Sequence, residues 1–364
     1  MQRYNLFLFS VLALMLFGLA MLSTASAVLA YQHTQDSYFY LKRQLLNGII
    51  PGLFFFFIAS RIPYKRYKPF ALPLMLACVV LLVLLFLPRF GLMAHGATRW
   101  LTVGSFSFQP SEALKLAFII YLAALFESRR EKMAHVTQGL LPFVMVMGAV
   151  SALLVRQPDI GTLGVILLTA LCVYFAAGAR ITHLALIVFG GLFALFIFVY
   201  GFGYEFDRIQ VYLNPHSDAQ GAGYQINRAA AAIGAGGAFG LGFGQSQRKF
   251  GGYLPEPMGD SIFAIIAEEL GFAGIAAALA LFVVLGWQGF SIARDAPDMF
   301  GGLIAAGVTS WILIQAFVNI GAISGLLPLT GIPLPFVSYG GTSLVVLFAA
   351  CGIVYNIQRS TYNT

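Results

Sequence analysis

Apolar runs of roughly 20 residues, separated by short polar connections, follow one another along almost the whole chain. A helix of about 20 apolar residues is long enough to cross the hydrocarbon core of a bilayer, so the pattern predicts an all-α polytopic membrane protein. Residues 1–364 are expected to form a single integral-membrane domain. The expected spans are residues 6–30, 44–60, 70–88, 111–127, 137–155, 162–178, 182–201, 261–288, 300–322 and 340–357.

Basic residues in the short connections predict the orientation in the membrane. They gather after the second, fourth and sixth spans, and the positive-inside rule places these connections and both termini in the cytoplasm. The long connection at residues 202–259, expected to be the only long one, then lies on the outer side. The basic residues are Arg61, Lys65, Arg66, Lys68, Arg129, Arg130, Lys132 and Arg180.

Composition agrees with this class of protein. Hydrophobic residues make up 59% of the chain and charged residues only 10%, whereas a soluble domain carries about 25% charged residues. The net charge of +7 is spread over the loops and forms no basic patch, so no nucleic-acid partner is expected. The first apolar run exceeds the core of a signal peptide and is expected to be retained, with a cleaved signal as the alternative.

The long outer connection contains a glycine-rich stretch, AIGAGGAFGLGFG at residues 232–244. It matches neither GxGxxG nor the GxxxxGK[ST] phosphate-binding loop, so a nucleotide site has no support. Glycines permit close approach of two backbones, which predicts a re-entrant or surface-lying segment. Tyr224, Gln225, Asn227 and Arg228 precede the stretch, and Arg248 and Lys249 follow it.

The chemistry is expected near residues 254–271, which hold four of the chain's 14 acidic residues, namely Glu256, Asp260, Glu268 and Glu269. A carboxylate at membrane depth costs about 2.5–3.5 kcal/mol on insertion scales unless it is paired or faces water. Asp260 precedes a helix, so it is either an N-cap or a general base whose pKa is raised by partial desolvation. Both roles can coexist in one residue.

Glu268 and Glu269 lie deeper in the expected helix than Asp260. Eight residues place Glu268 about 12 Å further in on nearly the same face, and Glu269 points about 100° away. We therefore expect the two glutamates to face different neighbours. They either bound a cavity or pair with polar groups inside the bundle.

Three further polar groups are candidates for a site. Glu112 and Lys115 form an i,i+3 pair at the start of the fourth span and are either a neutral structural pair or a contact for an anionic ligand. In the outer turn RQPDIGT, Gln157 and Asp159 follow Arg156, which gives another charge pair beside ordinary turn chemistry. Arg99 beside Trp100 is either a membrane anchor or a cation for a ligand.

Residues 331–341 contain two prolines and three glycines immediately before the last span. Such a break at membrane depth persists only where protein or a water-filled cavity covers the freed backbone. Asn319, Ser324 and Ser338 are expected to line that cavity. The residues alone thus support a membrane protein with a charged cavity that opens outward and binds an anionic, lipidic molecule.

Several of these motifs together resemble the shape, elongation, division and sporulation (SEDS) family, which includes FtsW, RodA and SpoVE. The resemblance rests on residues 99–359 and on GATRWLTVGSFSFQPSEALKL, RQPDIGT, GYQINRAAAAIGAGG, YLPEPMGDSIFAIIAEELG and GAISGLLPLTGIPLPFVSYGGTSL. It implies a ten-helix protein of the bacterial inner membrane, a peptidoglycan glycosyltransferase that polymerises lipid II. The last of these segments is more similar to the division branch, FtsW, than to the elongation branch.

The resemblance also implies roles for residues. The essential aspartate of the family's LPExxxDxIFA motif falls on Asp260, although Met258, Gly259 and Ser261 stand where many members have His, Thr and Phe. Asp260 would activate the 4-hydroxyl of GlcNAc as general base. Candidates for substrate binding are Arg99, Lys115 and Lys249 at the pyrophosphate, Glu112, Asp159 and Glu256 as positioning groups, and Ser338.

The implied partners are lipid II, a class B penicillin-binding transpeptidase, other division or elongation proteins and membrane lipids. A divalent cation, Mg²⁺ or Mn²⁺, that bridges a carboxylate and the diphosphate is a further expectation. The alternatives are a flippase that carries lipid II across the membrane and a scaffold whose charges are merely satisfied inside the bundle.

Overall fold

The structure is a computed structural model, and it describes residues 4–87, 91–94, 97–103, 106–133, 135–197, 206–214, 222–249 and 253–361. Helices dominate these residues. The first eight are α1 (Tyr4–Thr34), α2 (Phe39–Gln44), α3 (Ile50–Arg61), α4 (Ala71–Leu84), α5 (Pro110–Glu127), α6 (Leu141–Arg156), α7 (Ile160–Ala176) and α8 (Ile181–Phe196). The others are α9 (Phe206–Leu213), α10 (Ala222–Gly236), α11 (Ile262–Arg294), α12 (Met299–Ile323) and α13 (Gly341–Thr361).

Every predicted span corresponds to a helix, so the polytopic helical class is confirmed. Six helical segments in the described part of the chain are long and apolar enough to cross a membrane, and three shorter apolar helices accompany them. The predicted span 44–60 is one run in which a π-helical turn at Leu45–Ile49 joins α2 to α3. Residue 88 and residues 198–201, predicted as helix ends, lie outside the described residues.

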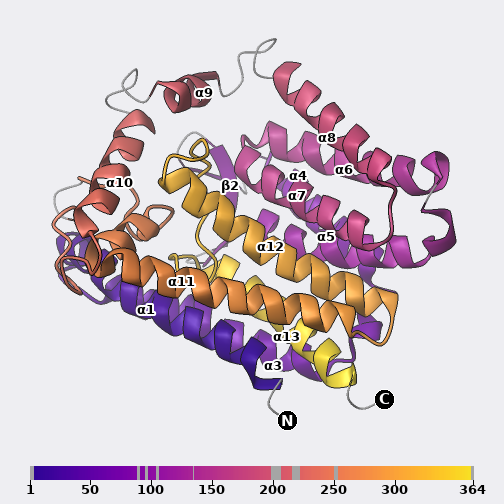
Figure 1. Cartoon of the computed structure of the whole chain (residues 1–364), viewed down its shortest axis with the longest axis horizontal. Helices are drawn as coiled ribbons and strands as arrows, with labels where there is room; N and C mark the ends of the chain where they lie inside the picture. The colour runs from indigo at the N-terminus through magenta and orange to yellow at the C-terminus, as the bar shows by residue number, and fades with distance from the viewer. Residues whose placement is uncertain are drawn as a thin grey trace.

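The helix α12 occupies the middle of the bundle (Figure 1), where it packs against α5, α7, α11 and α13. Small residues permit this close packing, as is usual where helices meet inside a membrane. Gly307 lies against Ile119 of α5 and Val173 of α7, and Gly289 of α11 lies against Thr309. The largely buried helix α12 can therefore carry polar side chains among the helices that it contacts.

The helix α1 begins and α13 ends at the same end of the bundle (Figure 1). The basic connection after α3 pairs with acidic residues of two other segments, since Lys65 lies 3.1 Å from Asp298 and Lys68 lies 2.7 Å from Glu127. Asn356 of α13 joins them by accepting a hydrogen bond from the Tyr64 backbone N–H at 2.9 Å. Figure 1 shows α10 at the opposite end of the bundle.

The connection between α4 and α5 contains a small antiparallel sheet that we did not predict. Its strands β1 (Gly91–Ala94), β2 (Ala97–Val103) and β3 (Phe106–Phe108) pair in the order β1-β2-β3. The register places Leu101 opposite both Gly91 and Phe108. This connection, residues 85–109, is shorter than the one at residues 202–259.

The connection at residues 202–259 contains the helices α9 and α10, and α10 packs on α11. Residues 202–205, 215–221 and 250–252 of it lie outside the described residues. The described part brings α10 and the glycine-rich stretch to the start of α11. This places them beside the acidic residues of interest.

Candidate functional site

Asp260 lies directly before α11, and its side chain faces α10. The N-cap of α11 is Ser261, so the interpretation of Asp260 as the N-cap is wrong. The amide of Gln225 on α10 donates to Asp260 Oδ1 at 3.2 Å and to Ser261 Oγ at 3.0 Å. A neutral amide thus holds the carboxylate, and no ion pair of Asp260 occurs within the described residues.

The backbone around Asp260 is fixed by three hydrogen bonds from other segments. The carbonyls of residues 258, 259 and 260 accept, in that order, from the Tyr339 N–H at 2.8 Å, Ser338 Oγ at 2.6 Å and Asn319 Nδ2 at 2.9 Å. Three successive carbonyls are therefore held by the break before α13 and by α12. A carboxylate on so constrained a loop has a nearly fixed position.

The pKa of Asp260 is raised to about 6, chiefly because its half-buried position desolvates the charged form. The hydrogen bond from Gln225 acts in the opposite direction, and the negative charge of Glu256 raises the pKa further. A carboxyl group with a pKa near neutrality is both ionised and appreciably basic at physiological pH. The pKa of Asp260 is thus shifted toward neutral pH.

Residues 331–340 connect α12 to α13 without helix, as the prolines and glycines predict. Polar side chains from α12 satisfy the freed backbone, since Asn319 Nδ2 donates to the Ile332 carbonyl at 2.7 Å and Gln315 Nε2 to the Pro333 carbonyl at 3.0 Å. Ser338 Oγ accepts from the Leu334 N–H at 2.8 Å. Protein groups thus cover the break, which confirms the expectation from its composition.

Glu269 lies on α11 and is fully buried. Its carboxylate pairs with Lys249 Nζ at 2.9 Å and accepts from Thr24 Oγ1 of α1 and from the Gly244 N–H, each at 2.9 Å. Lys249 is itself buried and also donates to the Gly244 carbonyl at 2.7 Å. A buried charge pair with this many hydrogen bonds tethers residues 244–249 to the helix.

Glu268, also fully buried, binds the same segment. It accepts from Ser246 Oγ at 2.6 Å and pairs with Arg248 at 3.1 Å. The expectation that Glu268 and Glu269 face different neighbours is therefore wrong. Residues 244–249 curve around α11 and meet both faces, a course that helical spacing alone does not reveal.

The helix α11 is interrupted at Gly271, whose φ of 63° and ψ of −160° are not helical. The glycine-rich stretch fills this interruption with hydrogen bonds in both directions, as close backbone approach predicts. Neither Gly236 nor Gly240 has room for a Cβ, because each lies against the α11 backbone. The four bonds run from Leu241 N to Glu268 O, Gly242 N to Glu269 O, Phe272 N to Gly237 O and Ala273 N to Ala238 O.

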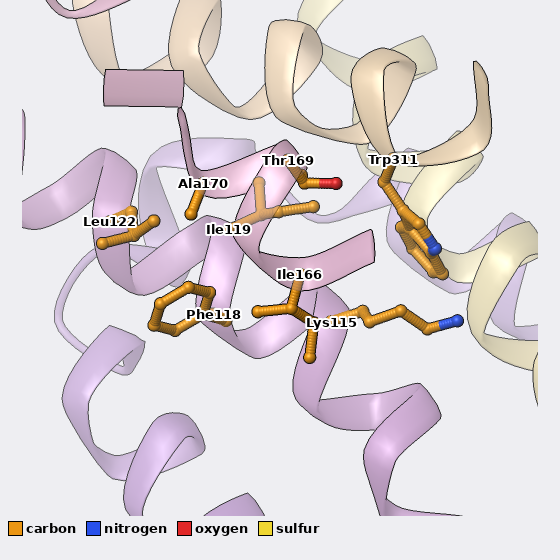
Figure 2. Close-up of a pocket in the computed structure, with 8 residues that line it drawn as sticks. All are labelled: Lys115, Phe118, Ile119, Leu122, Ile166, Thr169, Ala170 and Trp311. Carbon is orange, nitrogen blue, oxygen red and sulfur yellow. The ribbon is translucent and has the colours of Figure 1, made fainter. Parts of the chain in front are cut away.

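Glu112 and Lys115 form a buried ion pair at 2.7 Å in the first turns of α5. Lys115 Nζ also donates to Gln315 Oε1 at 2.8 Å and lies 4.9 Å from the ring centroid of Trp311. Figure 2 shows the Lys115 side chain reaching toward Trp311 at one side of a pocket otherwise lined mainly by apolar side chains of α5 and α7. The lysine is thus charge-compensated by protein.

The face of α12 connects this pocket to Asp260. Trp311, Gln315 and Asn319 recur every four residues and so lie along one face of the helix. Trp311 and Lys115 both donate to Gln315, and Asn319 holds the Asp260 carbonyl. Of this row of polar groups, we predicted only Asn319 from the sequence. The four-residue spacing of polar side chains in an apolar helix is the signal that could have identified the other two.

The outer turn between α6 and α7 contacts the small sheet. Arg99 of β2 donates to the Pro158 carbonyl, and Asp159 caps α7 by accepting from the Thr162 N–H at 3.4 Å. Gln157 is buried and donates to the Leu82 carbonyl at 2.9 Å. Each of these residues bonds a backbone group of a neighbouring segment, and no contact within the described residues joins them directly to Asp260.

The predicted residues thus fall into separate groups. One group contains Asp260, Ser338 and Asn319. Another group contains Glu268, Glu269 and Lys249. Glu256 is exposed and reaches Asp260 electrostatically. No group of three or more acidic, histidine or cysteine side chains that could hold a metal ion occurs in the described part of the chain.

Sequence comparison gives one family over nearly the whole chain. A family model for FtsW, RodA and SpoVE, described as cell cycle protein, matches residues 4–363. Stage V sporulation protein E of Bacillus subtilis (strain 168) is 42% identical over 348 residues, covering 96% of this chain and 94% of that protein. A probable peptidoglycan glycosyltransferase FtsW of Geobacter metallireducens is 37% identical over 364 residues, covering 100% of this chain and 96% of that protein.

Solved structures share the fold over the same extent. A chain from a peptidoglycan synthase complex, in which polymerization and crosslinking are coordinated, is similar with a TM-score of 0.81 and 28% identity, and 98% of each chain is covered. The rod shape determining protein RodA of Thermus thermophilus is similar with a TM-score of 0.72 and 29% identity, covering 98% of this chain and 96% of that one.

Proposed function

The chain belongs to the FtsW, RodA and SpoVE family of multi-pass membrane proteins, and we propose that it is a peptidoglycan glycosyltransferase that polymerises lipid II. The observation that carries this proposal is the half-buried Asp260, with a pKa raised to about 6, on a loop whose three carbonyls are fixed. Relatives named as glycosyltransferases support the reaction class.

In this proposal Asp260 is the general base. Its carboxylate takes the proton from the 4-hydroxyl of the acceptor GlcNAc, and that oxygen attacks the anomeric carbon of the donor sugar. The bond from this carbon to the diphosphate breaks, and undecaprenyl diphosphate leaves with the electron pair. The fixed loop contributes by holding the base within reach of the hydroxyl.

The other predicted residues receive supporting roles. The Glu112–Lys115 pair and the row of polar groups on α12 would border the inner side of the substrate cavity. Lys249 and Glu269 would hold the segment that enters the site, and Arg99 and Asp159 would shape its outer rim. A divalent cation, Mg²⁺ or Mn²⁺, would be held by the Asp260 carboxylate and would supply further positive charge for the leaving group.

The proposal also sets the location and the partner. With both termini in the cytoplasm of a bacterial inner membrane, Asp260 faces outward, where lipid-linked disaccharide pentapeptide is polymerised. The similarity to a chain of a peptidoglycan synthase complex supports a penicillin-binding transpeptidase as partner.

The experiment uses the purified chain with its transpeptidase partner and lipid II, and glycan strands are resolved on a gel. We expect strands from the natural chain and none from Asp260→Asn, with Mg²⁺ and a chelator as separate arms. Wild-type polymerisation by Asp260→Asn would remove the proposed base. Translocation of lipid II across vesicles without any glycan product would instead establish a flippase.

A further inference from the structure

Two arginines and two tyrosines gather beside α10, outside the chemistry assigned above. Arg228 Cζ lies 3.8 Å from the ring centroid of Tyr253 and 4.8 Å from that of Tyr224. Arg248 Cζ lies 5.6 Å from the same Tyr253 centroid. All four side chains of this arginine–tyrosine cluster are partly exposed, so a ligand can reach them.

Among the described residues, the cluster brings two cations together against one recorded carboxylate partner, Glu268. Two guanidinium groups that converge on one ring repel each other unless an anion lies between them. Arg248 forms an ion pair with Glu268. Within the described residues, Arg228 instead contacts the rings of Tyr224 and Tyr253. The two arginines, Arg248 foremost, lower the pKa of Tyr253, as expected where a negative charge is favoured.

The cluster lies one helical turn from the contact with Asp260. Arg228 follows Gln225 by three residues on α10, which places their Cβ atoms about 5–6 Å apart on one face. Gln225 donates to the Asp260 carboxylate at 3.2 Å. An anion held by Arg228 would therefore lie beside the proposed base.

We propose that the arginine–tyrosine cluster binds the diphosphate of the lipid-linked sugar, with Arg228 as the principal contact. This inference rests on the proposed function. The planar guanidinium fork matches phosphate oxygens, and it would stabilise the charge that develops on the diphosphate as the sugar–oxygen bond breaks.

The buried lysines are less suited to this role, because each already faces a carboxylate. Lys249 lies 2.9 Å from Glu269 and Lys115 lies 2.7 Å from Glu112. Both pairs are nearly inaccessible to solvent, so an incoming diphosphate would have to displace a buried partner. Arg228 forms no ion pair with a carboxylate in the part of the chain that the structure describes, so a diphosphate would have no such partner to displace there.

The test measures binding of undecaprenyl diphosphate to the full chain in phosphatidylcholine vesicles, without turnover. Arg228→Gln should weaken binding at least about tenfold, since a charge-assisted hydrogen bond is lost. The affinity of Arg228→Lys should lie between that of the natural chain and that of Arg228→Gln. The control is Lys42→Gln, an exposed cation that pairs with Asp36 and should leave affinity unchanged. Thermal unfolding of each variant confirms that it is folded, and Arg248→Gln is a second variant with a smaller expected loss.

Competition distinguishes the source of the phosphate. Undecaprenol should not compete, and phosphatidylglycerol should compete only weakly. Equal competition by phosphatidylglycerol, or natural affinity in Arg228→Gln and Arg248→Gln, would overturn the assignment. A chain that binds undecaprenyl diphosphate through Arg228 yet makes no glycan would overturn the proposed function and leave this site standing.

Discussion

Asp260 and the pair Glu268 and Glu269 belong to one acidic stretch, yet the structure treats them in opposite ways. The two glutamates are fully buried, and each faces a cation and further hydrogen-bond donors. Asp260 is only half-buried, and its side chain accepts a hydrogen bond from the neutral amide of Gln225. The nearby side chain of Glu256 carries a negative charge, the same sign as that of Asp260.

This difference teaches how one residue type takes two roles. A buried carboxylate that is paired with a cation and accepts further hydrogen bonds serves to hold segments of the fold together. A carboxylate that is partly desolvated and lacks a cation keeps its affinity for a proton. The partners, more than the depth in the protein, decide which acid is reactive.

The strongest way to break the comparison is Asp260→Asn. We expect the polymerisation rate to fall by about 10²–10⁴-fold, the usual contribution of a general base, with little change in thermal stability. Gel assays with lipid II and unfolding of the purified variant measure the two quantities. A variant that unfolds at a much lower temperature would instead give Asp260 a structural role.

Glu269→Gln should show the reverse behaviour. It leaves Lys249 buried without its counter-charge, which costs about 3–5 kcal/mol of stability. Thermal unfolding in detergent, with the exposed Glu256→Gln as matched control, measures this loss. Equal stability of the two variants would show that the buried pair does not tether the segment.

Ser338→Ala tests the fixed backbone of the reactive loop. It removes the donor to the Gly259 carbonyl and the acceptor for the Leu334 N–H, so about 1–3 kcal/mol of stability should be lost. We expect kcat to fall more than KM rises. Ser324→Ala, where the hydroxyl bonds only its own helix, is the control and should change neither.

The smallest expected effect is a shift in pH dependence. Because Asp260 must be ionised to act as a base, the rate should fall about tenfold per pH unit below a midpoint near pH 6. Glu256 raises the pKa of Asp260, so Glu256→Gln should move that midpoint to lower pH. Rates measured from pH 5 to 8 would contradict this if the midpoint stayed or rose.

The helices could be predicted from the sequence, because spans of about 20 apolar residues admit one structure in a bilayer. Asp260 could be proposed as a site residue as well, because a carboxylate at the start of an apolar helix is costly unless it is paired or faces water. The small sheet could not, since the strand β3 has only three residues and too little pattern to read.

Contacts between segments that are distant in the sequence could not be predicted either. Helical spacing says which way Glu268 and Glu269 point, but it says nothing of a loop that curves around both faces. Arg228 was noted only as a residue beside the glycine-rich stretch, because its position near Tyr253 depends on how residues 222–253 return to α11. Polar residues can be counted from the sequence, whereas their partners require the fold.

The interruption of α11 at Gly271 has a consequence for protein engineering. Residues 236–244 and 268–273 complete each other's backbone hydrogen bonds, so neither stretch is a replaceable module. A chimera whose exchanged stretch carries a side chain in place of Gly236 or Gly240 would collide with the α11 backbone and lose these bonds. Functional hybrids should therefore arise when both stretches are transplanted from the same parent.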